Sequence, residues 1–205
     1  MIKTLILAGG DAQYHDHLAA AQNIQRFLLK KDVVAQYSQD FNILTSERIE
    51  GYDTVIFSTQ DKDLSQAEQN GLKEFITAGG SFIGLHAANV FADENHEIYE
   101  EIIGSRFIHH DPFQRFEVIT DDNSFITKDI SSFEIDDELY ECKLLFEPDQ
   151  ILAWTEYKGE KHPMLYTKTI GQGEMCYLAL GHDGRAWYHP SFQELLHRSL
   201  LYLNQ

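Results

Sequence analysis

The sequence has few cysteines and no paired cysteine motif. Its two cysteines are Cys142, in a polar stretch, and Cys176, in an apolar one, and no C-x-x-C spacing occurs. Neither a disulfide framework nor a thiolate zinc site is indicated, which fits a reducing compartment. The amino-terminal apolar run spans only about four residues, too few for a signal peptide or a membrane span. We therefore expect a cytoplasmic protein.

Positive charge is also scarce. The 205 residues hold 16 Lys+Arg against 33 Asp+Glu, a formal net charge of −17. Such a surface repels phosphate backbones and anionic lipids, so nucleic acid and membranes are not expected as partners. A neutral or cationic small molecule is favoured. The length suits one domain over residues 1–205, with a sizeable core.

Strand and helix patterns alternate over the first 90 residues. Apolar and amphipathic runs predict, in order, a strand at 3–8, a helix at 16–30, strands at 33–37 and 52–59, a helix at 64–80 and a strand at 81–85. This rhythm is typical of a parallel sheet covered by helices on both faces. Because ligands gather at the carboxyl ends of such strands, we expect the segments after Gly10, Thr59 and Leu85 to converge.

The second half has a different pattern. After a short helix at 97–103, turns separate apolar runs at 115–120, 151–157, 162–170 and 173–181. These runs predict antiparallel hairpins that extend the sheet. An amphipathic stretch at 191–203 predicts a closing helix.

Several of the ten histidines follow predicted strands. They are His15, His86, His109 or His110, and His182. His86 stands at a predicted corner between a strand and a helix. A side chain at this corner projects into the crevice expected at the carboxyl ends of the strands. With a reference pKa of about 6.5, an imidazole serves as base, acid or metal ligand near neutral pH. For each histidine taken alone, a purely structural role stays open.

Other polar and aromatic residues lie near these histidines. Trp187 and Asp183 follow His182, where an aromatic face beside polar groups suits a sugar ring, or where the tryptophan anchors the last helix. The acidic run at 136–138, with Tyr140, is expected to be mostly solvated charge. Among the histidines, only the His15 and His17 pair has metal-ligand spacing, so a divalent metal stays open and none is required.

Five motifs, in order along nearly the whole chain, resemble the trehalose-utilisation, or ThuA-like, family. They are LILAGG with YHDH, GGSFIGLHAA, F-x-x-H-x-P-F at 107–113, F-x-I-x-D-E-L-Y at 133–140, and G-x-G-x-x-x-Y-x-x-L-G-H-D-x-x-x-W at 171–187. The resemblance implies a fold like that of class I glutamine amidotransferases: an α/β, flavodoxin-like three-layer sandwich. Its central sheet would be mainly parallel, with helices on both faces and antiparallel strands in the C-terminal half.

The resemblance also bears on chemistry. His86 stands where amidotransferases carry the elbow cysteine of G-x-C-x-G, and His182 and Asp183 fall near the other members of their triad. Without that thiol, glutamine hydrolysis through a thioester is not available. The fold carries over and the activity does not.

The family's association with sugar catabolism implies a keto-sugar or 3-keto-glycoside as substrate, handled by isomerisation, hydration or elimination. In this hypothesis His86 and His182 are the base and the acid, and His110 polarises the carbonyl oxygen. The residues expected to position the sugar are His15, Glu138, Tyr140, Asp183 and Trp187. The alternatives are a non-catalytic carbohydrate-binding or regulatory module and a metal-dependent hydrolase. A homodimer stays open.

Overall fold

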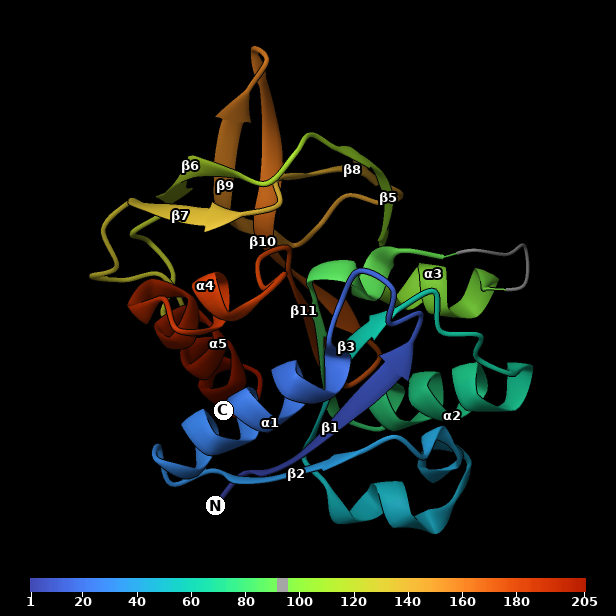
Figure 1. Cartoon of the computed structure of the whole chain (residues 1–205). Helices are drawn as coiled ribbons and strands as arrows, with labels where there is room; N and C mark the ends of the chain where they lie inside the picture. The colour runs from blue at the N-terminus through green and yellow to red at the C-terminus, as the bar shows by residue number, and fades with distance from the viewer. Residues whose placement is uncertain (92–95) are drawn as a thin grey trace.

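The computed structural model describes residues 1–91 and 96–205, and Figure 1 shows a large twisted sheet flanked by helices. Five parallel strands in the order β2-β1-β3-β4-β11 form one half of this sheet. They are β1 (Lys3–Gly10), β2 (Val34–Ser38), β3 (Thr54–Gln60), β4 (Ser81–Leu85) and β11 (Gly173–Leu178). This is the flavodoxin-like strand order.

Antiparallel strands continue the sheet in the order β10-β9-β6-β7, as expected from the hairpin patterns. They are β6 (Gln114–Thr120), β7 (Phe133–Asp137), β9 (Gln150–Tyr157) and β10 (Glu160–Ile170). A separate two-stranded sheet pairs β5 (Ser105–His110) with β8 (Tyr140–Leu144). Strands β5, β7 and β8 were not predicted.

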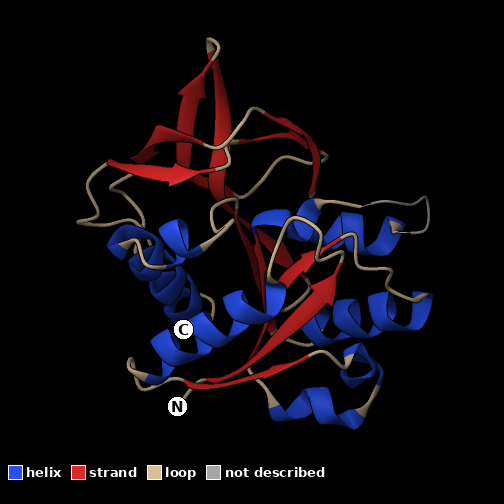
Figure 2. Ribbon diagram, in the orientation of Figure 1, coloured by secondary structure: helices blue, strands red, loops and turns tan. Residues whose placement is uncertain are grey.

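Helices cover both faces of the parallel half, which confirms the three-layer arrangement. The helices are α1 (His17–Leu29), α2 (Gln66–Thr77), α3 (Glu97–Ile103), α4 (Gly184–Trp187) and α5 (Pro190–Tyr202). Short 3-10 turns lie at Phe41–Thr45 (η1), Glu47–Gly51 (η2) and His86–Asn89 (η3). Figures 1 and 2 show α1 and α5 on one face of the sheet and α2 and α3 on the other. Among the described residues, no helix combines the length and apolar character needed to cross a bilayer.

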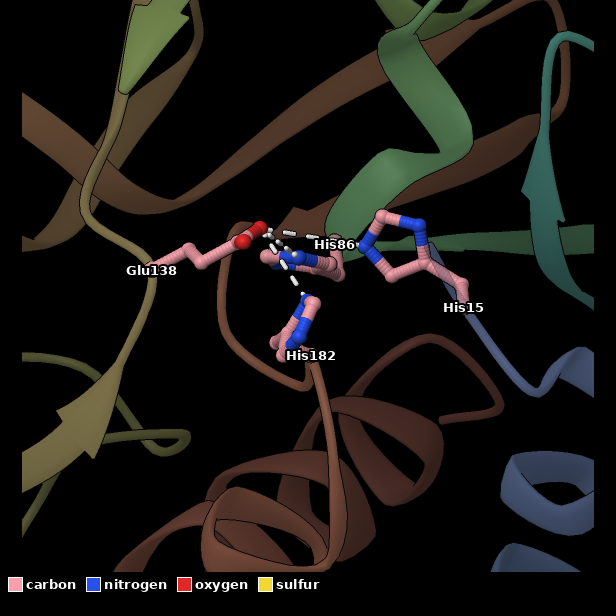
Figure 3. A group of neighbouring side chains, drawn as sticks. All are labelled: His15, His86, Glu138 and His182. Atoms are coloured by element: carbon pink, nitrogen blue, oxygen red, sulfur yellow. Dashed lines mark ion pairs between the residues drawn. The ribbon is translucent and has the colours of Figure 1, made fainter. Parts of the chain in front are cut away.

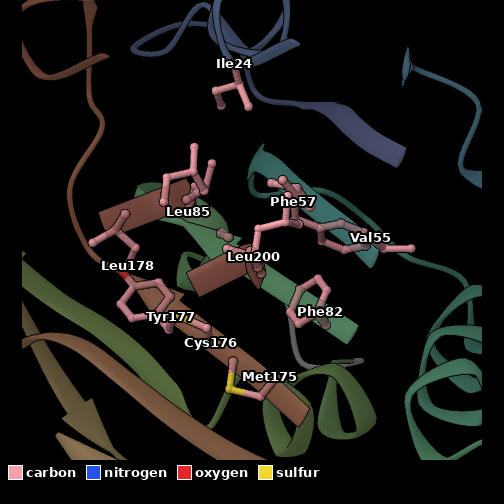
Figure 4. Close-up of a cluster of buried hydrophobic side chains, with 14 of the residues drawn as sticks. Ile24, Val55, Phe57, Phe82, Leu85, Met175, Cys176, Tyr177, Leu178 and Leu200 are labelled. Atoms are coloured by element: carbon pink, nitrogen blue, oxygen red, sulfur yellow. The ribbon is translucent and has the colours of Figure 1, made fainter. Parts of the chain in front are cut away.

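The core fixes the strands beneath the site. Phe57 of β3 packs edge-on against Phe82 of β4, with ring centroids 5.0 Å apart, and against Tyr99 of α3. On the opposite face, Ile24 of α1 and Leu200 of α5 are buried in the same cluster (Figure 4). Because packed interiors are rigid on the time average, the strand ends hold the polar side chains in fixed positions.

The corner at His86 is tighter than the sequence predicts. An α-helix was expected to begin there, but a single 3-10 turn, η3, follows β4. His86 has φ +45°, a left-handed conformation that costs a non-glycine residue of the order of 1–3 kcal/mol. The hydroxyl of Tyr177 donates to the His86 carbonyl at 2.7 Å. This fixed, unfavourable conformation aims the imidazole into the crevice.

A second tight position lies at the end of β1. Gly10 has φ +100°, and a Cβ built there would lie 1.9 Å from the carbonyl oxygen of Gln60. We expect Gly10→Ala to lower the free energy of unfolding by about 3 kcal/mol, measured by urea denaturation. Gly159→Ala is the matched control, because Gly159 also has positive φ (+83°) but nothing within 4 Å. It should cost only about 1 kcal/mol, and equal losses would contradict the collision.

Candidate active site

Four side chains from distant segments meet at the carboxyl ends of the parallel strands (Figure 3). His15 follows β1, His86 follows β4, His182 follows β11, and Glu138 lies between β7 and β8. Each offers one ligand atom, and these atoms all lie within 4.8 Å of one another. The expected convergence of strand ends is confirmed. The carboxylate comes from the antiparallel part of the chain.

Glu138 is the hub of this group. Its Oε2 lies 3.1 Å from His182 Nδ1, 3.4 Å from His86 Nε2 and 3.8 Å from His15 Nε2. Its other oxygen, Oε1, lies 3.8 Å from Nε2 of His110. One carboxylate therefore faces four imidazoles.

Hydrogen bonds on the outer side of the rings set two of the tautomers. Nδ1 of His86 donates to the carbonyl oxygen of Ala179 at 2.8 Å, and Nδ1 of His15 donates to Oε1 of Gln60. In a neutral imidazole the other nitrogen then carries a lone pair. Both Nε2 lone pairs consequently point at the Glu138 carboxylate. Such an arrangement is repulsive unless a proton or a cation lies between these groups.

The surroundings shift the pKa values of these groups in different directions. Burial and the neighbouring His86 lower the pKa of His15 to about 3. Burial also disfavours the charged forms of Glu138 and His182. This effect is outweighed because the two side chains lie close together and stabilise each other's charged form, and His86 also stabilises the charged form of Glu138. The pKa of Glu138 is thereby held well below its ordinary value, and that of His182 is raised. At neutral pH, His15 is neutral and Glu138 is ionised.

Asp137 braces the site from beneath. Its carboxylate is fully buried and accepts the backbone N–H groups of Gly181 (2.7 Å), His182 (3.1 Å) and Glu138 (2.9 Å). Burial raises the pKa of Asp137, although these three bonds oppose the shift. The expectation that the acidic run is mostly solvated is wrong for Asp137 and Glu138, and Tyr140 is only 2% exposed.

His110, rather than His109, is the histidine of its pair that faces the site. Nδ1 of His110 donates to the Asp111 carbonyl oxygen at 2.8 Å, which turns Nε2 toward Glu138. His109 is 55% exposed and pairs with the Asp111 side chain. Tyr157 and Lys158 also bind that carboxylate, so Asp111 anchors the β5–β6 turn.

Of the remaining predicted residues, Tyr140 and Trp187 support the site, whereas Asp183 is engaged elsewhere. Tyr140 packs its ring on His86, with centroids 4.1 Å apart. Trp187 donates its Nε1–H to the Gly181 carbonyl oxygen at 2.7 Å, and so braces the loop that carries His182. Asp183 caps α4 and binds Arg185. His17 binds the Asp11 carbonyl oxygen and is not in the four-residue group.

The site has a closed side and a more open one. A cavity of about 20 Å³ lies behind the histidines, lined in part by Ile24, Ser58, Thr59, Leu85, Trp187 and Phe192. It has room for a single water molecule and is too small for a sugar ring. Toward the β5–β6 turn the side chains are more accessible, at 12% for Glu138, 16% for His182 and 33% for His110. This is the side of the site that solvent reaches.

Neither cysteine offers a reactive thiol near neutral pH. Cys142 and Cys176 are free, and burial raises the pKa of the first to about 11 and of the second to about 12. Both thiols are therefore protonated at neutral pH. The elbow position belongs to His86.

The fold and the site define a flavodoxin-like α/β protein with a histidine and carboxylate centre at the carboxyl ends of its parallel strands. The sequence profile of the ThuA family, described as trehalose utilisation, matches residues 3–203. The chain belongs to this family, which relates it in general terms to sugar metabolism. Among curated proteins, no sequence matches this chain.

Solved structures share the fold. A ThuA-like protein from Parabacteroides merdae has a TM-score of 0.86 at 16% identity, covering 98% of this chain and 89% of that chain. A ThuA-like protein from Bacteroides uniformis has a TM-score of 0.81 at 19% identity, covering 98% and 91%. A β-galactosidase from Bacillus circulans sp. alkalophilus contains a similar region, with a TM-score of 0.70 at 13% identity, covering 98% of this chain and 30% of that chain.

Proposed function

We propose that this protein is an enzyme of sugar catabolism that moves a proton next to the carbonyl group of a keto-sugar, such as a 3-keto-glycoside. The observation that carries the proposal is a gradient of exposure across one polar site. His86 is 3% exposed at its base, Glu138 is 12% exposed, and His110 is 33% exposed at its rim. The lone pair on Nε2 of the rim imidazole suits a base, and the neighbouring His182 is the proton donor that would work with it.

The depth of each side chain favours particular roles. His110 Nε2 would take the proton from C2 or C4, and the C–H electron pair would move toward the C3 carbonyl to give an enediolate. In an isomerisation after C2 deprotonation, the proton is delivered to C3 while the C2 hydroxyl loses its proton and becomes the new carbonyl. In an elimination after C2 deprotonation, a C1–C2 double bond forms, the C1–O bond breaks, and the leaving glycosidic oxygen takes the proton from His110. His86 lies behind Tyr140 and Glu138. This position argues against the direct proton transfer expected from the sequence, and because Nδ1–H is donated to Ala179, His86 has no N–H left for the carbonyl oxygen.

The charge of the molecule is consistent with a neutral ligand. With a formal net charge of −17, the chain disfavours phosphorylated sugars, whereas a neutral keto-glycoside meets no long-range repulsion. The accessible side of the site, between His110 and His182, is also where the ring of Phe113 lies, 5.9 Å from that of His182. The guanidinium of Arg185 stacks on one face of this ring, 3.4 Å from its centroid, so the C–H groups of a sugar would pack on the other face.

Exchange of carbon-bound protons tests this proposal. We expect the wild-type protein in D2O to remove the C2 or C4 proton signal of a 3-keto-glucoside from the proton NMR spectrum. His110→Ala should slow the exchange by about 10²-fold, the usual contribution of a positioned base.

His109→Ala is the matched control, because it removes the neighbouring imidazole that faces solvent and should leave the rate within about twofold. Equal losses in the two variants would contradict the role of His110. Binding of the sugar without exchange by wild type would favour the non-catalytic carbohydrate-binding module.

A further inference from the structure

Four buried polar atoms at the centre of the site have no hydrogen-bond partner among the described residues. They are Nε2 of His15, Nε2 of His86, Nδ1 of His182 and Oε2 of Glu138. His182 Nδ1 and Glu138 Oε2 are 3.1 Å apart, yet the pair does not reach hydrogen-bond geometry. An unsatisfied buried polar atom costs about 1–3 kcal/mol, so four that face one another require an explanation.

We propose that His15, His86, His182 and Glu138 form a binding site for one divalent transition-metal ion. The four atoms that face one another are the ligand atoms, and a cation between them removes the repulsion of their lone pairs. Each comes from a different segment of the fold, so the site forms only when the chain is folded. This inference goes beyond the proton-transfer proposal and does not depend on it.

The separations match a coordination sphere. Ligands held about 2.1 Å from zinc in a tetrahedron are about 3.4 Å apart, and larger coordination numbers give a wider range around that value. The three distances from Glu138 Oε2 to the imidazole nitrogens are 3.1, 3.4 and 3.8 Å. All four ligand atoms lie within 4.8 Å of one another, so the widest pair would close by up to about 1.4 Å for a tetrahedral sphere and by less for a larger coordination number.

The second layer of contacts also fits a metal site. Ligating histidines usually donate their outer N–H to a carbonyl or carboxylate, which fixes the ring and its tautomer. Here Gln60 accepts from His15 and the Ala179 carbonyl accepts from His86. Asp137 accepts the backbone N–H groups of His182 and Glu138 and so holds the other two ligands in place.

The ligand types favour some metals over others. Three imidazoles and one carboxylate suit Zn²⁺, Mn²⁺, Fe²⁺, Co²⁺ or Ni²⁺, whereas Mg²⁺ and Ca²⁺ prefer all-oxygen sites. We therefore expect Zn²⁺ and Mn²⁺ to bind and Mg²⁺ to bind far more weakly.

Metal titration tests the inference without any sugar. Protein stripped with a chelator is titrated with ZnCl₂, MnCl₂ and MgCl₂ by calorimetry, and its metal content after dialysis is measured by mass spectrometry. We expect one zinc or manganese ion per chain and a rise in melting temperature. His15→Ala and Glu138→Gln should weaken binding by more than about 10²-fold, and Gln60→Leu, which removes only an outer contact, by about 10-fold.

His109→Ala is again the control, because a solvent-facing histidine should not affect a specific site. Circular dichroism of each metal-free variant separates loss of binding from loss of folding. Absence of stoichiometric binding in wild type, or binding that survives in both ligand variants, would overturn the inference. Stoichiometric metal without proton exchange would instead overturn only the proposed sugar chemistry.

Discussion

Glu138→Gln is expected to slow proton exchange on a 3-keto-glucoside by about 10³-fold. Glutamine keeps the size of the side chain but removes the charge that faces four imidazoles, with its oxygens 3.1 to 3.8 Å from their nitrogens. The amide would either donate its N–H₂ group to the lone pairs of the imidazoles, or present its carbonyl oxygen, which is a weaker metal ligand than a carboxylate. Initial exchange rates at equal protein concentration measure the effect.

Glu134→Gln is the matched control for this variant. Glu134 lies on the same strand, β7, and is exposed. Its substitution should leave the exchange rate within about twofold and the melting temperature unchanged. If Glu138→Gln exchanged protons at the wild-type rate, the Glu138 carboxylate would have no role in the reaction. Loss of activity in both variants would instead point to a change in β7.

Asp137→Ala is expected to lower the free energy of unfolding by about 3 kcal/mol or more. The variant would leave the backbone N–H groups of Gly181, His182 and Glu138 without their buried acceptor. Because all three belong to the segments that carry His182 and Glu138, exchange activity should fall even in the fraction that is folded. Urea denaturation and exchange assays on the same preparation measure both effects.

Asp136→Ala provides the comparison. Asp136 is the preceding residue, but its carboxylate is 40% exposed and pairs with Arg115 at the surface. Surface ion pairs contribute about 0–1 kcal/mol, so the loss should stay below about 1 kcal/mol. Similar losses at the two positions would mean that burial of the Asp137 carboxylate contributes little to stability.

The parallel half of the fold follows closely from the sequence. Apolar runs at β1, β3 and β4 and the capping box of Ser65 and Glu68 before α2 are local signals, and each is present in the structure. Once these strands are parallel, their carboxyl ends must lie at one edge of the sheet. This explains why the sequence alone predicts that His15, His86 and His182 lie near one another.

The carboxylate part of the site was harder to predict. Glu138 and Asp137 stand in a run of acidic residues that has the composition of a solvated loop, and β7 brings them to the site by long-range pairing with β6. The one local signal is the alternation of Phe133, Ile135 and Asp137, which places Asp137 on the inward face of β7 and Asp136 on the other. The motif match named Glu138 as a sugar-positioning residue, but not its contact with four imidazoles.

Strand β5 was missed because its pattern is irregular. A shift in register between Phe107 and His109 breaks the alternation that identifies a strand, and Ile108 is 58% exposed. The same shift helps to decide which histidine of the pair faces Glu138. The choice between His109 and His110 therefore required the three-dimensional pairing of β5 with β8.

In the proposed function, the rim histidine His110 and the inner group around Glu138 act as one centre on a keto-sugar. A double-mutant cycle in the D2O exchange assay, with His110→Ala, Glu138→Gln and both together, tests it most directly. Residues that act in one step lose activity non-additively, so the double variant should exchange at the Glu138→Gln rate, about 10³-fold below wild type. A further loss of about 10²-fold in the double variant, or no exchange by wild type, would contradict the claim.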